Sequence, residues 1–279
     1  MSTALAVFHG AFGRVCLYLM DRGMVPHGHR EGHLIFHLQG PPAEMVVNDR
    51  AFPMAPGQAV AVSPWQTHYF RPLHDDAPTL GLVLYIRPAW FLEASRRATA
   101  SLSFGRVGIE VTDQVARLVF GTTQSMMDPD KEDPLLEDRI CSLTQLAFDQ
   151  SWQWTGRGDS FTGPMFVKRD YRIRNALRVL QKRVGEALAL DAVAREVGLS
   201  RPHFYKLFRE QIGLTPNLYL NALRMERAID RLALSQEAVS DIGFDLGFSS
   251  QASFSRFFIA NGVVPPSAYR RSIHVSLPQ

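Results

Sequence analysis

Apolar and polar positions change their spacing along the chain, and the change divides the chain into two parts. In residues 1 to about 90, short apolar runs alternate with turn-forming clusters such as Gly40-Pro-Pro and Ala55-Pro-Gly57. Short strands separated by frequent turns are typical of a small barrel or sandwich. We expect strands around the apolar runs at 15–19, 34–36, 59–62 and 80–86.

Two helices are expected after these strands, at about 110–127 and 134–153. In the second, an apolar residue recurs at spacings of three and four, which predicts a stripe along one face of the helix. The residues of the stripe are Leu136, Ile140, Leu143 and Ala147. A second copy of the chain is the commonest partner for such a surface, so the stripe predicts a homodimer. Packing against the chain's own strands is the alternative.

The second part of the chain reads as helical throughout. Gly and Pro residues cluster between 155 and 164, and this composition predicts a linker. The expected division is a domain at 1–154, a linker at 155–168 and a second domain at 169–279. In the second domain, Pro216 suits the first turn of a long helix that runs to residue 234.

Two related segments lie inside the second domain, at 190–208 and 239–258. In each, a small residue precedes a glycine by four: Ala194 and Gly198, then Gly243 and Gly247. A short helix, a tight turn and a second helix need this arrangement, since the small residue lets the helices cross closely. The helix after such a turn is the one that enters the major groove of DNA. Because the pattern occurs twice, it is not explained by a chance match, and it predicts two DNA-reading units.

These segments resemble the AraC/XylS (arabinose-regulator) family of bacterial transcription factors, over about residues 171–271. The motifs that carry the resemblance are Gly198-Leu-Ser, Phe204-Tyr-Lys-Leu-Phe208, Gly213-Leu-Thr-Pro216, Arg224-Met-Glu-Arg-Ala228, Gly247-Phe-Ser, Phe254-Ser-Arg-Phe-Phe258 and Pro266-Ser-Ala-Tyr-Arg270. One departure is Gly243, where the family usually has alanine. Glycine inside a helix costs roughly 0.5–1 kcal/mol relative to alanine, so we expect the second helix pair to be looser.

The resemblance implies an α+β protein of two domains. The N-terminal domain would be a cupin-like β-barrel with dimerisation helices, which binds a small-molecule effector. The C-terminal domain would be all-α, with two helix-turn-helix units. The implied function is transcription regulation, mostly activation, in the bacterial cytoplasm. Double-stranded DNA and RNA polymerase are the implied partners, with no enzymatic activity and no cofactor.

Helical spacing separates the expected core of each reading helix from its DNA-facing side. Phe204 and Phe208 in the first helix, and Phe254 and Phe258 in the second, fall on the core side. Gln251 can pair with adenine, and Arg256 with guanine, across the major groove. The candidate DNA-binding residues are Arg201, Pro202, His203, Tyr205, Lys206, Ser250, Gln251, Ser255 and Arg256.

Histidines cluster near the N-terminus, in a pattern that resembles the ligand pattern of cupins. His27, His29 and His33 are close in sequence, and His68 follows later. Two interpretations stay open. The first is a metal-free effector pocket that includes His29, His33, Trp65 and His68, because histidine donates and accepts hydrogen bonds. The second is a metal site of His27, His29, His33 and His68, since imidazoles suit zinc, iron, copper or nickel. It would make the chain a metal sensor or a metal-dependent enzyme fused to a DNA-binding domain.

Charge and cysteine content agree with this division. The net charge is +3, but residues 168–279 hold 17 Lys or Arg against 10 Asp or Glu. A basic domain suits a polyanionic partner such as DNA. Cys16 and Cys141 are too few and too far apart for a disulfide framework. The sequence has no apolar run long enough to span a membrane and no signal-peptide pattern, so we expect a cytoplasmic protein without a membrane partner.

Overall fold

Two sheets form the N-terminal part of the molecule. The structure, a computed structural model, describes residues 2–74, 77–95, 102–128, 133–153, 170–186, 188–262 and 264–275. In these ranges the larger sheet has the strand order β10-β1-β2-β8-β3-β6-β9, and the smaller sheet has the order β5-β4-β7. The strands are β1 Thr3–Gly10, β2 Gly13–Met20, β3 Gly32–Gln39, β4 Ala43–Val47, β5 Arg50–Met54, β6 Gln58–Val62, β7 His68–Pro72, β8 Thr79–Ile86, β9 Gly108–Glu110 and β10 Ile273–Val275. The expected barrel is therefore an open one, made of two sheets that share a core.

Both faces of the larger sheet are buried, which explains why its central strands read as continuous apolar runs. Successive side chains of a strand point to opposite faces. In β3, Leu34 and Phe36 pack into one apolar cluster and Ile35 packs into another. A strand that is buried on both sides loses the alternation of apolar and polar residues.

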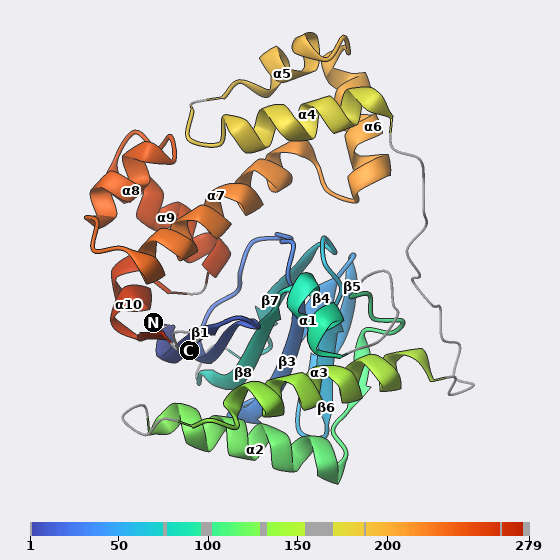
Figure 1. Cartoon of the computed structure of the whole chain (residues 1–279), viewed down its shortest axis with the longest axis vertical. Helices are drawn as coiled ribbons and strands as arrows, with labels where there is room; N and C mark the ends of the chain where they lie inside the picture. The colour runs from blue at the N-terminus through green and yellow to red at the C-terminus, as the bar shows by residue number, and fades with distance from the viewer. Residues whose placement is uncertain are drawn as a thin grey trace.

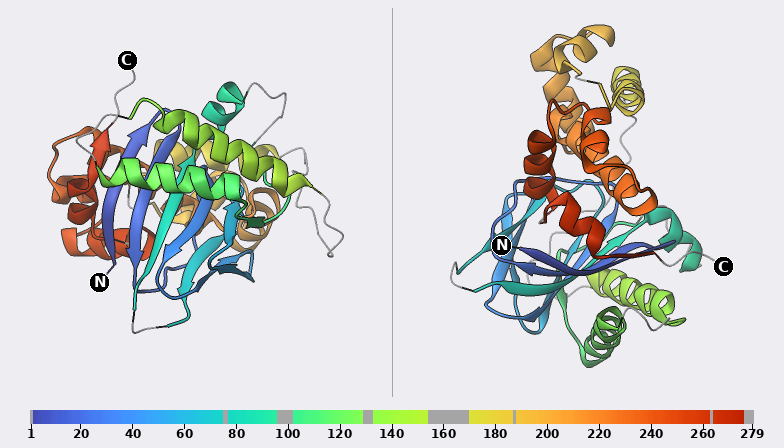
Figure 2. Two further views of the ribbon diagram at one scale, coloured as in Figure 1. Left: turned by 90° about the horizontal axis from the view of Figure 1, so that it is seen from below. Right: turned by 90° about the vertical axis from the view of Figure 1, so that its left-hand side faces the viewer.

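Three helices follow the strands: α1 Pro88–Ala94, α2 Asp113–Met127 and α3 Leu136–Trp152. α2 and α3 lie side by side across one face of the larger sheet (Figures 1 and 2). The apolar stripe of α3 is buried in this layer, where Ile140 and Leu143 are 0% exposed and pack with sheet residues such as Val15 and Leu84. The prediction that this stripe forms a dimer surface is therefore wrong, because the chain's own sheet and α2 cover it.

The C-terminal part contains two helix-turn-helix units joined by one long helix. The helices are α4 Tyr171–Lys182, α5 Leu190–Glu196, α6 Arg201–Ile212, α7 Pro216–Leu234, α8 Val239–Asp245, α9 Gln251–Gly262 and α10 Pro266–Arg271. α5 and α6 form the first unit, α8 and α9 form the second, and α7 runs between them (Figure 1). The long helix expected at 216–234 is confirmed with these bounds.

Glycines shape the turn of each unit, as the repeat predicts. Gly198 and Gly247 have φ angles of 72° and 83°, in the left-handed region that favours glycine. Gly243 has a different role, since a Cβ atom at this position would lie 2.9 Å from Cβ of Phe254. The missing methyl group lets α8 and α9 cross closely, so the looser packing expected for this pair is not what the structure has.

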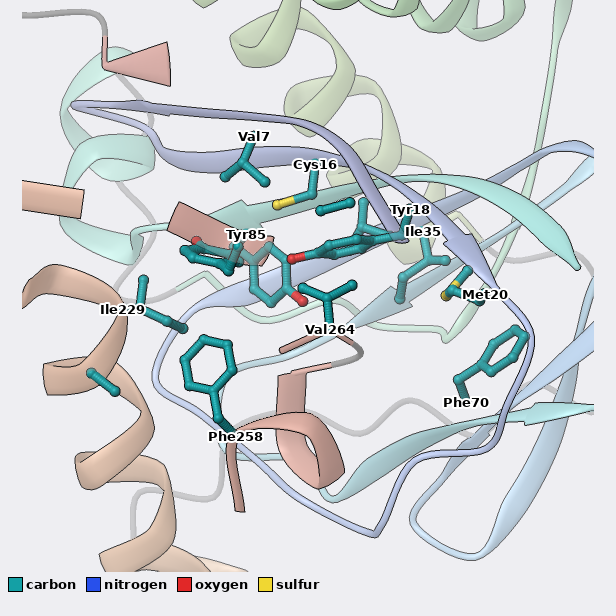
Figure 3. Close-up of a cluster of buried hydrophobic side chains, with 14 of the residues drawn as sticks. Val7, Cys16, Tyr18, Met20, Ile35, Phe70, Tyr85, Ile229, Phe258 and Val264 are labelled. Atoms are coloured by element: carbon teal, nitrogen blue, oxygen red, sulfur yellow. The ribbon is translucent and has the colours of Figure 1, made fainter. Parts of the chain in front are cut away.

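The second helix-turn-helix unit is docked on the N-terminal sheets. One apolar cluster includes Val7 and Tyr85 of the larger sheet together with Ile229 of α7 and Phe258 of α9 (Figure 3). After α10, the chain adds β10 to the larger sheet, parallel to β1, with Ile273 opposite Val7. The two parts thus share a core and a sheet.

The structure bears on only some of the domain limits expected from the sequence. The linker expected at 155–168 lies outside the described residues. The C-terminal strand β10 belongs to the N-terminal sheet, although the sequence places it in the DNA-binding domain. No helix in the described ranges combines the length and apolar character needed to cross a membrane.

Candidate functional site

The first reading helix, α6, turns a polar face away from its core. Phe204 and Phe208 are fully buried, and the candidate DNA-binding residues lie around them at positions 201–203, 205 and 206. Tyr205 is half-buried, and its hydroxyl accepts a hydrogen bond from Asn217 at 3.2 Å. The other four candidates are exposed: Arg201, Pro202, His203 and Lys206. This helix therefore offers a basic, solvent-facing surface with one side chain tied to α7.

Arg201 is paired on this surface with Asp191 of α5, at 3.2 Å between Nη1 and Oδ2. Both side chains are more than half exposed. An exposed ion pair contributes little stability, on the order of 0–1 kcal/mol. Arg201 is thus free to exchange the carboxylate for a phosphate at small cost.

The second reading helix, α9, has the same construction. Phe254 and Phe258 are buried, Gln251 and Arg256 are exposed, and Ser255 is half-buried. Ser250 precedes the helix, and its hydroxyl accepts a hydrogen bond from the backbone N–H of Ser253 at 3.1 Å. This is the geometry of an N-cap, so the Ser250 side chain stabilises the helix start.

The spacing of the two reading helices is set by α7. Its 19 residues make a rod roughly 28 Å long at 1.5 Å per residue. Successive major grooves on one side of DNA are about 34 Å apart. Arg224 of α7 bonds two backbone carbonyls that follow α4, those of Val184 at 3.3 Å and Glu186 at 3.1 Å. The length of α7 and the hydrogen bonds of Arg224 are consistent with two helix-turn-helix units held rigidly at the spacing of adjacent major grooves.

Four histidines predicted from the sequence come together in the N-terminal part. His27 and His29 lie in the segment before β3, His33 lies on β3, and His68 begins β7. The His27 and His68 backbones form an isolated antiparallel bridge, with N–O distances of 3.0 and 2.8 Å. The ring centroids of His29 lie 4.6 Å from His33 and 5.0 Å from His68. The structure therefore assembles the histidine cluster that the spacing suggested.

Burial keeps these histidines neutral. His29, His33 and His68 are 9%, 4% and 1% exposed. Desolvation lowers the pKa of His68 to about 3 and the pKa values of His29 and His33 well below 6.5, and neighbouring histidines lower them further. Neither ring nitrogen of His29 or His33 has a hydrogen-bond partner among the described residues. A buried polar atom without a partner costs about 1–3 kcal/mol, so this cluster is expensive unless something binds it.

A small cavity lies between this cluster and the C-terminal helices. His27 and His29 line it from one side, and Asn221 and Glu226 of α7 line it from the other. Its volume is about 30 Å³, which holds roughly two water molecules. Glu226 is mostly buried here, and desolvation raises its pKa to about 7 although Arg30 opposes the shift. The cavity is thus small, lined by both polar and apolar groups, and located where the two parts of the molecule meet.

A buried ion pair supports one wall of the cavity. Arg14 Nη1 donates to Glu31 Oε1 at 2.9 Å, and the guanidinium carbon lies 3.5 Å from the ring centroid of Tyr85. Both charged side chains are about nine-tenths buried. Burial is the largest single effect on the Arg14 pKa and lowers it, but the Glu31 carboxylate, together with Tyr269, Tyr85 and Cys16, outweighs burial, so the pKa of Arg14 is raised well above its usual value. The pair holds β2 and the segment before β3 together.

Trp65 lies apart from the cavity, although the sequence suggested that it lines the effector pocket. Its ring centroid is 5.0 Å from that of Tyr219 in α7, and it packs against the core of the first helix-turn-helix unit. His33 and His68 contact His29 but do not line the cavity either. The sequence missed Arg14, Glu31 and Glu226, because the docking of α7 that brings them together leaves no local pattern.

Two family models match the chain. Residues 14–147 match the AraC-like ligand binding domain, and residues 193–272 match a helix-turn-helix domain. The first match covers the strands from β2 to β9 with α1, α2 and most of α3, and the second covers nearly all of both reading units.

Some named relatives match little more than a third of the chain, and another matches most of it. The regulatory protein PocR of Salmonella typhimurium is 34% identical over 105 residues, which are 38% of this chain and 35% of PocR. The transposon Tn10 TetD protein of Escherichia coli is 33% identical over 36% of this chain and 72% of TetD. RhaS, an HTH-type transcriptional activator of Escherichia fergusonii, is 24% identical over 86% of this chain and 85% of RhaS. The chain thus spans only about a third of PocR but most of TetD and RhaS.

Solved structures of ToxT from Vibrio cholerae share the overall fold. An apo ToxT variant has a TM-score of 0.62 at 14% identity, over 95% of this chain and 98% of that one. ToxT with a bound unsaturated fatty acid has a TM-score of 0.55 at 14% identity, over 92% and 94%. The same arrangement of an N-terminal sheet domain and a C-terminal helical domain therefore occurs in both proteins.

Proposed function

Because the chain belongs to the AraC/XylS family of transcriptional regulators, we propose that it binds specific double-stranded DNA sites and activates transcription in response to an effector. The observation that carries this proposal is the pair of polar faces on α6 and α9, set apart by α7. Acting on DNA, it would work in the cytoplasm and contact RNA polymerase. Its role is regulation rather than catalysis.

The two reading helices would divide the work of DNA binding. On α9, Arg256 and Gln251 are exposed and carry the donor groups that pair with guanine and adenine. On α6, Lys206 and Arg201 would contact phosphates or bases, while Pro202 offers only apolar contact. His203, Tyr205 and Ser255 lie on the same faces, and Ser250 would act through its position at the start of α9.

A binding assay with the full chain tests the DNA part of the proposal. Fragments selected from genomic DNA should bind more tightly than random DNA, and the affinity should fall steeply with salt. Arg201→Ala should weaken binding, whereas Arg117→Ala should not, since Arg117 is an exposed arginine of α2 far from the reading helices. Binding without sequence selectivity at low salt would refute the proposal.

The effector would act where the two parts of the molecule meet. The cavity touches His27 and His29 on one side and α7 on the other, so an occupant contacts the element that sets the spacing of the reading helices. ToxT is known with a fatty acid, but a cavity of about 30 Å³ does not accommodate an acyl chain. The docked arrangement therefore favours a very small effector. His29→Gln should abolish the transcriptional response in cells while the protein still binds its DNA site.

The regulator would act as a homodimer through the outer side of the helical layer. The α3 stripe is buried, but α2 exposes Phe120 and Met127, at 63% and 64% of their surface. A second subunit is the commonest partner for such residues. Phe120→Arg should convert a dimer to a folded monomer in sedimentation experiments, and a wild-type protein that sediments as a monomer would refute the dimer.

A further inference from the structure

The hydrogen bonds of two histidines define which ring nitrogen each one leaves available. Nδ1 of His27 lies 2.9 Å from the carbonyl oxygen of Val25, and Nδ1 of His68 lies 2.8 Å from that of Gln66. A carbonyl oxygen only accepts, so each Nδ1 carries the hydrogen and each Nε2 keeps a lone pair. A hydrogen bond from one ring nitrogen to a carbonyl is the usual way to orient a histidine that ligates metal through the other.

His29 lies beside these two histidines. One ring nitrogen from each of His27, His29 and His68 lies within 4.8 Å of the other two. His29 and His68 are at least nine-tenths buried. Both nitrogens of His29, and Nε2 of His68, lack a hydrogen-bond partner among the described residues. Three imidazole nitrogens thus lie close together, and His29 and His68 each have a ring nitrogen without a hydrogen-bond partner among the described residues.

We propose that His27, His29 and His68 bind a divalent first-row transition-metal ion, such as zinc or nickel, and that this ion is the regulator's effector. The role of the ion as effector rests on the proposed function, whereas the metal site itself does not. Three neutral imidazoles form a ligand set that suits these metals.

The size of the site fits an ion better than an organic effector. Metal–nitrogen bonds of about 2.0–2.1 Å place the ligand atoms of a tetrahedral site roughly 3.3 Å apart. The nitrogens, now up to 4.8 Å apart, would have to approach by up to about 1.5 Å. The adjoining cavity of about 30 Å³ offers room for a water molecule in a fourth position.

The segment that carries two of these ligands also supports both reading units. The N–H of Val25 donates to the carbonyl of Ala260 in α9 at 3.2 Å. Arg30 is paired with Glu226 of α7, at 3.1 Å from Nε to Oε1. Gly28 packs closely against Leu214, where a Cβ atom would lie 3.1 Å from that side chain. Drawing His27 and His29 toward His68 would therefore shift the surface on which α7 and α9 rest.

Metal binding is tested first on the purified full-length chain, with Co²⁺ as the probe because its visible absorption reports coordination. We expect about one Co²⁺ per chain, displaced by Zn²⁺. His27→Gln should weaken Co²⁺ binding at least roughly tenfold with an unchanged circular dichroism spectrum. His74→Gln, which changes an exposed histidine outside the cluster, should bind like the wild type. A wild type that binds no stoichiometric Co²⁺, or a folded His27→Gln that binds as tightly, would overturn the site.

Coupling to DNA is tested with the same proteins and a selected DNA fragment. The affinity of wild type and His74→Gln for this fragment should change at least about fivefold between Zn²⁺ and a chelator, whereas that of His27→Gln should not. Equal affinity in both conditions would overturn the effector role. A complete lack of sequence selectivity, with or without metal, would instead refute the proposed function, and the Co²⁺ titration would still decide the site.

Discussion

Replacing Gly243 by alanine has two opposite effects on the stability of the fold, and the approximate size of each is known. Alanine stabilises the interior of a helix by about 1 kcal/mol relative to glycine. The added Cβ atom, however, would lie 2.9 Å from Cβ and 3.0 Å from Cγ of Phe254, well inside the ordinary contact distance of about 3.5–4.0 Å. The Cβ atoms of the new alanine and of Phe254 are both bonded directly to the backbone. Rotation of the Phe254 ring therefore does not relieve this contact, and α9 has to move.

The steric cost is expected to exceed the gain in helix propensity. Overpacking a well-packed core typically costs about 1–3 kcal/mol. Subtracting the gain leaves a net loss of about 1 kcal/mol, which lowers the melting temperature of a chain of this size by roughly 2–4 °C. Moving α9 also displaces Gln251 and Arg256, so DNA affinity should fall as well.

Calorimetry of the full chain measures this effect, with Gly121→Ala as the matched control. Gly121 also lies inside a helix, α2, but the nearest atom to its added Cβ is Cδ of Arg139 at 3.3 Å, part of a flexible side chain. The control should therefore be stabilised by about 0.5–1 kcal/mol. If Gly243→Ala is as stable as the wild type or more so, the close crossing of α8 and α9 does not limit this position.

Three further predictions follow from other contacts. Arg256→Ala should change the preferred base at one position of the DNA site and cost about 1–3 kcal/mol there, in a binding assay over sequence variants, and unchanged preference would place α9 away from the bases. Leu143→Arg should unfold the N-terminal part, because Leu143 is 0% exposed, and a cooperative thermal transition like that of the wild type would contradict this. The ring of His9 contacts the Tyr269 hydroxyl at 3.0 Å, and burial lowers the pKa of His9 to about 3. The contribution of His9 to stability is therefore complete above pH 6.5 and is lost as the pH falls from 6.5 toward 3. Denaturant unfolding between pH 7 and pH 5 should therefore depend less on pH in His9→Gln than in the wild type, and equal dependence would refute the assignment.

Local sequence patterns predicted the local structure well. The bounds of α7, the left-handed turns at Gly198 and Gly247, and the buried phenylalanines of α6 and α9 follow from spacing, glycine and proline. The histidine cluster was also predictable, because histidines that are close in sequence need only one later residue, His68, to complete the cluster.

Contacts between distant segments were not predictable in the same way. The α3 stripe has the same spacing whether it packs on a sheet or on a second subunit, and only the fold decides between them. The shared core of Tyr85 and Ile229, and the strand β10, depend on docking of the C-terminal helices, which leaves no periodic signal. For the same reason the cavity residues Arg14 and Glu226 were missed.

Footprinting on a selected DNA fragment tests most directly whether both units read DNA. Interference by methylated guanine N7 reports contacts in the major groove. With α6 and α9 set apart by the 19 residues of α7, we predict two contacted segments about 10 base pairs apart on one face of the DNA. Arg256→Ala should remove the interference at the guanine that Arg256 contacts in one segment and leave the other segment, which belongs to α6, unchanged. A single contacted segment, or the same interference pattern in Arg256→Ala and the wild type, would contradict the two-unit reading of DNA.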